Sequence, residues 1–249
     1  MKPSPNHGER REGPTDILLM HYTGMAEADK ALQWLCSPES SVSCHYFIFE
    51  NGDVVQLVSE DRRAWHAGRG SWAGCEDVNS RSVGIEIANP GHAHGYPDFP
   101  EVQMQAVLAL SADVCARLGI PPERVLAHSD IAPGRKQDPG EKFPWAWFSE
   151  HGVGHWVPPE PLAGGRFLQL GDAGQPVEAL QALLAAYGYG CAITGVFDEA
   201  TRDVVTAFQL HFRPERVDGV ADQSTIETLN RLLSSSPRGL SGTHLTGTA

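Results

Sequence analysis

The 249-residue chain lacks any run of about 18 uncharged apolar residues, so no segment is expected to span a membrane. The first twenty residues mix charged residues with proline and glycine, and no apolar stretch of signal-peptide length precedes Asp16. Two interpretations of the compartment stay open: a cytoplasmic protein, or a periplasmic protein whose leader has been removed. We expect a monomer.

Positive charge is scarce, since 19 Lys and Arg residues stand against 31 Asp and Glu residues and give a net charge of -12. A chain this acidic repels polyphosphate, which argues against a nucleic-acid partner. The five cysteines form no CxxC pair, so neither a disulfide framework nor a zinc ribbon is predicted. The HExxH motif of the common metalloproteases is also absent.

Apolar spacing predicts alternating strands and helices through the first 150 residues. Alternation or continuous runs of apolar residues predict strands, and spacing of three and four residues predicts helices. Asn51-Gly52, between two β-rich runs, predicts a hairpin. The expected elements are a strand at 17–20, a helix at 25–36, the hairpin within 43–58, a strand at 82–89, a helix at 101–118 and a strand at 125–127. This pattern indicates an α/β fold with a mixed central β-sheet flanked by helices.

The composition changes at 157–165, where three prolines and two glycines mark a linker. Beyond the linker, apolar residues at helical spacing predict a small all-α domain of three helices. Its sequence contains the pattern G-V-x-D-x-x-T twice, at 195–201 and 219–225, with Asp198 and Asp222 in positions that suit helix N-caps. We therefore expect a catalytic domain at 1–156, the linker, a three-helix domain at 166–234 and a disordered tail at 235–249.

Two histidines stand apart from the other nine because each directly follows an apolar strand. His21 ends the first strand and His128 follows the last one, so both are expected at one rim of the sheet. A loop with Pro133 and Gly134 can fold Asp138 back toward His128. Two imidazoles and one carboxylate suit Zn²⁺ and leave a fourth position for water.

Glu86 is unusual because it lies in the middle of an apolar strand. Its neighbours on the same face, Gly84 and Ala88, are small and leave space, as the wall of a cleft would. A glutamate beside a metal-bound water is the usual general base. The alternative is an ordinary strand with its polar face toward solvent. Lys136 lies two residues before Asp138, so both side chains point to the same side of an extended chain. The alternative interpretation is that Lys136 is an ordinary solvated cation near an acidic residue.

Five segments then resemble the zinc N-acetylmuramoyl-L-alanine amidases, which have the amidase_2, peptidoglycan-recognition fold. They are HYT at 21–23, SCHYFIFENGDVVQLV at 43–58, AWHAG at 64–68, SVGIEIAN at 82–89 and HSDIAPGRKQDPG at 128–140. The resemblance covers roughly residues 15 to 150. It implies that His21, His128 and Asp138 bind one zinc ion, that Glu86 is the catalytic acid and base, and that Lys136 stabilises the tetrahedral intermediate.

The same resemblance places further residues along a substrate groove. His66 is expected to contact substrate, with a structural role as the alternative, and Tyr46 is a weaker candidate because HY in a strand can be plain packing. Trp72 is expected to stack on a sugar ring, although tryptophan also occurs as a core residue. Asn89 and Arg135, in two of the matching motifs, complete the expected substrate contacts. His92 and His94 are expected in a mobile loop near the cleft rather than in a second metal site.

The second domain resembles the three-helix peptidoglycan-binding module. The sequence thus predicts a hydrolase that cleaves the amide between N-acetylmuramic acid, or its anhydro form, and L-alanine, with peptidoglycan or muropeptide fragments as partners. The alternatives are a non-catalytic wall-binding protein and a zinc endopeptidase or carboxypeptidase. We expect deletion of 161–249 to spare hydrolysis of soluble fragments and to weaken attachment to intact wall.

Overall fold

The computed structural model describes residues 2–11 and 13–236, so most of the predicted disordered tail lies outside the described residues. A five-stranded sheet forms the first half of the molecule, in the order β4-β3-β6-β2-β7. The strands β3, β6, β2 and β7 are parallel, and β4 is antiparallel at one edge. Their bounds are β2 (Ile17–Tyr22), β3 (Tyr46–Ile48), β4 (Val54–Gln56), β6 (Ser82–Ile87) and β7 (Val125–Ala127). A short second sheet pairs β1 (His7–Glu9) with β5 (Arg62–Ala64).

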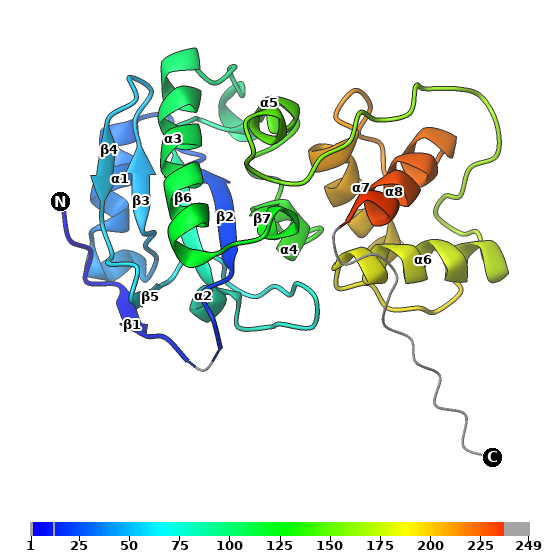
Figure 1. Cartoon of the computed structure of the whole chain (residues 1–249), viewed down its shortest axis with the longest axis horizontal. Coiled ribbons are helices and arrows are strands. Elements are labelled where there is room, and N and C mark those ends of the chain that lie inside the picture. The colour runs from blue at the N-terminus through cyan, green and yellow to red at the C-terminus, as the bar shows by residue number, and fades with distance from the viewer. Residues whose placement is uncertain (1, 12, 237–249) are drawn as a thin grey trace.

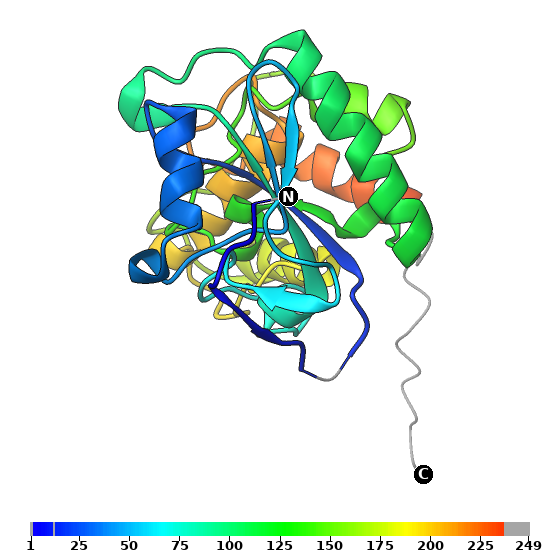
Figure 2. The same cartoon turned by 90° about the vertical axis from the view of Figure 1, so that its left-hand side faces the viewer.

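Helices cover both faces of the sheet, and Figure 2 shows α1 and α3 on opposite sides of it. The helices of this half are α1 (Ala28–Leu35), α2 (Val78–Arg81), α3 (Glu101–Leu118), α4 (His128–Ile131) and α5 (Trp145–Glu150), with 3-10 turns at Pro38–Ser40, His92–His94 and Pro122–Arg124. Alternation along β6 sends Val83, Ile85 and Ile87 into the core beneath α3. The α/β class, the hairpin around Asn51-Gly52 and the predicted strands and helices are confirmed.

The register of the parallel strands fixes the position of the candidate metal ligands. His21 lies opposite Glu86 on the neighbouring strand β6, and Met20 lies opposite Ala127 on β7. His128 therefore comes one residue beyond the partner of Met20, at the level of His21. Because parallel strands end at the same edge of a sheet, both histidines and Glu86 reach one rim.

The second half contains three helices, α6 (Gln175–Tyr187), α7 (Glu199–Phe212) and α8 (Gln223–Ser235), beside the sheet domain (Figure 1). Among the described residues, no helix has the length and apolar character needed to cross a membrane. Asp198 and Asp222 cap α7 and α8, because each carboxylate accepts a bond of 2.8 Å from the backbone N–H three residues later. Both N-cap predictions are confirmed.

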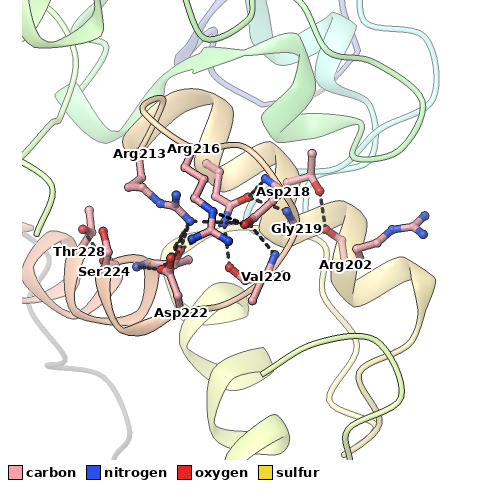
Figure 3. Close-up of polar contacts among 12 residues, drawn as sticks. Arg202, Arg213, Arg216, Asp218, Gly219, Val220, Asp222, Ser224 and Thr228 are labelled. Atoms are coloured by element: carbon pink, nitrogen blue, oxygen red, sulfur yellow. Dashed lines mark hydrogen bonds and ion pairs between the residues drawn. The ribbon is translucent and has the colours of Figure 1, made fainter. Parts of the chain in front are cut away.

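Each copy of the sequence repeat forms a turn that a buried glutamine side chain binds through hydrogen bonds. The side chain of Gln209 accepts hydrogen bonds from the backbone N–H groups of Asp218 and Gly219 and donates one to Val220 O, in the turn drawn in Figure 3. Gln181 makes the same three kinds of contact with the turn at 194–196. Both glutamines are fully buried, so each satisfies turn groups that water cannot reach.

A buried cluster of hydrogen bonds around Asp130 joins the two halves. Asp130 of α4, which is fully buried, accepts hydrogen bonds from Tyr189 Oη at 2.7 Å and from His211 Nδ1 at 2.6 Å. The imidazole of His211 also stacks on Trp145, with ring centroids 3.8 Å apart. Deletion of residues 161–249 would remove both side-chain donors from this buried carboxylate, so we expect the truncated protein to be less stable than the full chain. That it still hydrolyses soluble fragments stays a prediction.

Replacing Tyr189 by Phe should lower the free energy of unfolding by about 1–3 kcal/mol, because the Asp130 carboxylate loses one of its donors in a buried site. Urea unfolding followed by circular dichroism measures the change. Tyr46→Phe is the control, since its hydroxyl binds the partly exposed Glu60 and water can replace it. Equal midpoints for Tyr189→Phe and the wild type would contradict a stabilising role for this contact.

Candidate metal centre and catalytic cleft

Three buried side chains converge at the rim of the sheet. His21 Nδ1 lies 2.9 Å from His128 Nδ1 and 3.2 Å from Asp138 Oδ2, and His128 Nδ1 lies 3.0 Å from the same oxygen. Ligands about 2.0–2.1 Å from a tetrahedral ion are about 3.3 Å apart, so the three atoms are close to the spacing that one metal ion requires. The loop folds Asp138 back toward His128, as predicted, and a hydrogen bond of 3.0 Å from Ser129 N–H to Asp138 O holds it in this position.

The far nitrogen of each imidazole is occupied, which leaves Nδ1 for a metal. His128 Nε2 donates to Ala67 O at 3.0 Å, and His21 Nε2 donates to His66 Nδ1 at 3.0 Å. His66 Nε2 lies 3.3 Å from Ser82 Oγ, whose hydroxyl donates to Val78 O. Such outer hydrogen bonds fix the tautomer and the orientation of metal-binding histidines.

The electrostatics of the cluster favour a neutral imidazole beside a carboxylate. Burial, with the neighbouring His128, lowers the pKa of His21 to about 4 despite the nearby Asp138. Burial alone would raise the pKa of Asp138, but its contacts with His128 and His21 hold it below its usual range. At neutral pH His21 is thus unprotonated and Asp138 is ionised, as metal ligands must be.

Gly84 makes room for the histidine behind the cluster. A Cβ atom at this position would lie 2.4 Å from His66 Nδ1, so a side chain at 84 would displace the His66 ring. The backbone N–H of Gly84 donates to the buried His45 Nδ1 at 2.9 Å, which holds this strand segment in place. The space beside Glu86 that the sequence indicated at Gly84 is therefore filled by His66 rather than open.

Glu86 faces the cluster from β6 and lines the same cavity of about 430 Å³ as His21, His66, His128 and Asp138. Its Oε2 atom is buried and has no hydrogen-bond partner among the described residues. Burial raises the pKa of Glu86 well above its usual range, the charge of Asp138 raises it further, and Lys136 opposes the rise. An unpaired carboxylate of raised pKa is suited to take up a proton and release it again.

Lys136 and Arg135 lie on the exposed loop between His128 and Asp138, and both line the cavity. One Arg135 nitrogen, Nη2, donates to Ala67 O at 2.7 Å, which ties the loop to the segment that also binds His128. No hydrogen bond joins Lys136 Nζ to any described residue. The cation is thus available to a ligand in the cleft.

Three expected substrate contacts are corrected. Tyr46 pairs with Ile85, so its ring packs on the α3 side of the sheet, opposite Glu86, and its hydroxyl donates to Glu60. Trp72 is only 2% exposed and packs edge-on against Tyr189 of the second domain, so it cannot stack on a sugar. Asn89 is buried, donates to Pro97 O and accepts from Gly91 N–H, so it holds a loop.

Sequence reasoning missed a hydrogen-bonded chain at the edge of the cleft. Tyr22 Oη donates to His92 Nδ1 at 2.9 Å, and His92 Nε2 donates to Glu141 Oε2 at 3.0 Å. His92 also stacks on Tyr96, with ring centroids 4.1 Å apart. The sequence offered one clue to this chain: Tyr22 directly follows His21, a candidate metal ligand. The loop of His92 packs against Tyr22, which lines the cleft, and that the loop is mobile stays a prediction.

Comparisons with known proteins agree with this geometry. A family model described as N-acetylmuramoyl-L-alanine amidase matches residues 11–141, and one described as a putative peptidoglycan binding domain matches residues 173–229. The N-acetylmuramoyl-L-alanine amidase AmiD of Escherichia coli strain K12 is 37% identical over 231 residues, which cover 87% of this chain and 82% of that protein.

Two solved structures have the same overall fold. The complex of AmiD from E. coli with the substrate anhydro-N-acetylmuramic acid-L-Ala-D-gamma-Glu-L-Lys superposes with a TM-score of 0.76 at 35% identity, covering 92% of this chain and 97% of that chain. The crystal structure of AmpDh3 from Pseudomonas aeruginosa gives a TM-score of 0.74 at 30% identity, covering 95% of this chain and 96% of that chain.

The chelator-treated protein should bind one equivalent of Zn²⁺, and His128→Ala should abolish stoichiometric binding because it removes one of three ligands. Isothermal titration calorimetry measures both. His94→Ala, which removes an exposed histidine outside the cluster, should bind zinc as the wild type does. One equivalent of tightly bound zinc in His128→Ala would show that the ligands are elsewhere.

Proposed function

Because the chain belongs to the N-acetylmuramoyl-L-alanine amidase family, we propose that it hydrolyses the amide between N-acetylmuramic acid, or its anhydro form, and the L-alanine of a stem peptide. The observation that carries this proposal is the unpaired Glu86 carboxylate, in one cavity with a three-residue ligand cluster. An ion with one open position beside a free general base is the arrangement that hydrolysis of an amide by water requires.

The proposed cofactor is one zinc ion, held by His21, His128 and Asp138. Two imidazole nitrogens and one carboxylate oxygen are typical zinc ligands, and three protein ligands are typical of catalytic zinc. When bound, zinc supplies an acidified water, of pKa about 7, and polarises the carbonyl of the substrate.

Glu86 acts first as the base and then as the acid. Its free Oε2 accepts a proton from the attacking water, and the raised pKa lets it hold that proton until the amine departs. The protonated carboxyl then donates to the nitrogen of L-alanine, so the leaving group departs as a neutral amine. Lys136 donates to the oxygen of the scissile carbonyl, where negative charge develops, an interaction worth on the order of 3 kcal/mol.

We propose muropeptides as substrates, with the anhydro form included. The support is the solved complex of a relative that aligns over 92% of this chain and carries an anhydro-N-acetylmuramic acid tripeptide. The matched binding module at 173–229 supports peptidoglycan as the ligand of the second domain.

Glu86→Gln should lower kcat by roughly 100- to 10,000-fold while one zinc ion stays bound, because the amide keeps the shape of the carboxylate but cannot take up the proton. The assay follows release of the stem peptide from anhydro-N-acetylmuramic acid-L-Ala-D-γ-Glu-L-Lys by mass spectrometry. A product that begins with L-alanine identifies the amidase, and cleavage within the peptide would indicate a peptidase instead. Wild-type turnover by Glu86→Gln would exclude Glu86 as the base.

We further propose that His66 orients His21 rather than contacting substrate. His66→Phe keeps a ring on Gly84 but removes the acceptor for His21 Nε2, so zinc affinity should fall by about 10- to 100-fold. Competition with a chromophoric chelator measures the affinity. His151→Phe, an exposed histidine outside the cleft, is the control. If His66→Phe has unchanged zinc affinity and a raised KM, His66 contacts the substrate instead.

A further inference from the structure

A second cavity, of about 740 Å³, lies between the two domains. The catalytic half contributes the loop 134–137 and Glu141 to its wall, and helix α7 contributes Asp203, Thr206, Ala207 and Leu210. We call this cavity the interdomain groove. Its α7 residues follow the spacing i, i+3, i+4 and i+7, so they form one face of the helix.

The interdomain groove is continuous with the catalytic cleft. Arg135, Lys136 and Gln137 line both cavities, so one surface leads from the ligand cluster across this loop to α7. A ligand whose scissile bond lies at the cluster can therefore extend along the groove and reach the second domain.

The helix that forms the far wall is held firmly against the catalytic half. His211, one residue after Leu210, is bonded to the buried Asp130 and stacked on Trp145. The loop and the helix also approach closely near Asp203, because a Cβ atom at Gly134 would lie 2.1 Å from Asp203 Oδ2. Contacts at Asp130, Trp145 and Gly134 thus hold the two walls of the groove against each other.

Charges along this surface follow a definite order. The cations Arg135 and Lys136 lie at the junction with the cleft, whereas the carboxylates of Glu141 and Asp203 line only the interdomain groove. Arg135 bonds the protein backbone through Nη2 alone, so Nε and Nη1 have no partner among the described residues.

In each of the two carboxylates one oxygen is bonded to a neighbouring side chain. Glu141 Oε2 accepts from His92. Asp203 Oδ1 accepts from the guanidinium of Arg202, but Oδ2 receives no hydrogen bond from a described residue, and the side chain is 32% exposed. Asp203 is the carboxylate that helix α7 presents to a cationic ligand group in the groove.

The proposed substrate carries its charges in the matching order. After L-alanine comes a γ-linked D-glutamate with a free α-carboxylate, and then a lysine with a side-chain ammonium. We propose that Asp203 of the second domain binds the side-chain ammonium of the third stem residue, and that Arg135 binds the carboxylate of the second. The inference rests on the proposed function and makes the second domain a determinant of stem-peptide specificity.

The test compares two soluble substrates on the zinc-loaded full-length protein. One is the anhydro-muramoyl tripeptide with lysine in third position, and the other has norleucine there, which keeps the four-carbon chain and lacks the ammonium. The wild type should cleave the lysine substrate with a kcat/KM about tenfold higher, the effect of one charged hydrogen bond. Asp203→Asn should reduce this ratio to about one and leave the norleucine substrate unaffected.

Glu199→Gln is the matched control, because it removes one negative charge from the first turn of the same helix at a residue that does not line the groove. It should keep the tenfold ratio. The same ratio in Asp203→Asn as in the wild type, or an equal loss in Glu199→Gln, would overturn the role of Asp203 while leaving the amidase activity in place.

A binding measurement separates this inference from the proposed function. Calorimetry of both tripeptides with zinc-loaded Glu86→Gln gives their affinity ratio without turnover, and the double variant Glu86→Gln, Asp203→Asn gives the ratio without the carboxylate. Absence of hydrolysis by the wild type would refute the amidase proposal, whereas the affinity ratio would still decide whether Asp203 recognises the ammonium. Equal affinities of both compounds for Glu86→Gln would refute that recognition.

Discussion

The parallel pairing of β2 with β7 is the constraint on which the candidate site depends. It brings His21 and His128, 107 positions apart in the chain, to adjacent nitrogens 2.9 Å apart. Asp138 completes the cluster because the loop after His128 closes on Ser129. Burying three polar groups together is costly unless each is bonded, and here their mutual contacts and the outer contacts to Ala67 and His66 offset that cost.

Much of this arrangement could be predicted from local patterns. A strand alternates its side chains with a period of two, so the sequence alone puts Glu86 on the face opposite Ile85. Strands that end in His21 and before His128 also identify a shared rim, since parallel strands finish at one edge. Asp138 needed more than spacing, because a ten-residue loop can close in many ways, and the resemblance to a family singled it out.

The remaining residues could not be placed because their roles depend on distant parts of the chain. Tyr46 is aromatic and next to a histidine in a cleft-forming motif, but its register against Ile85 turns it to the other face. Trp72 is of a residue type that often stacks on sugars. Only the structure shows that Tyr189, more than a hundred residues later, packs against its ring and covers it. The contact between Asp130 and His211 likewise could not be predicted, because it depends on the packing of α7 against α4.

The hydrogen bonds at Asp130 also decide which second domains could stand beside this catalytic half. Here the acidic side chain two positions after a candidate metal ligand receives its bonds from Tyr189 and His211 of the neighbouring domain. A replacement module without an equivalent hydroxyl and imidazole would leave that carboxylate without its side-chain donors, so a functional exchange would have to preserve both groups.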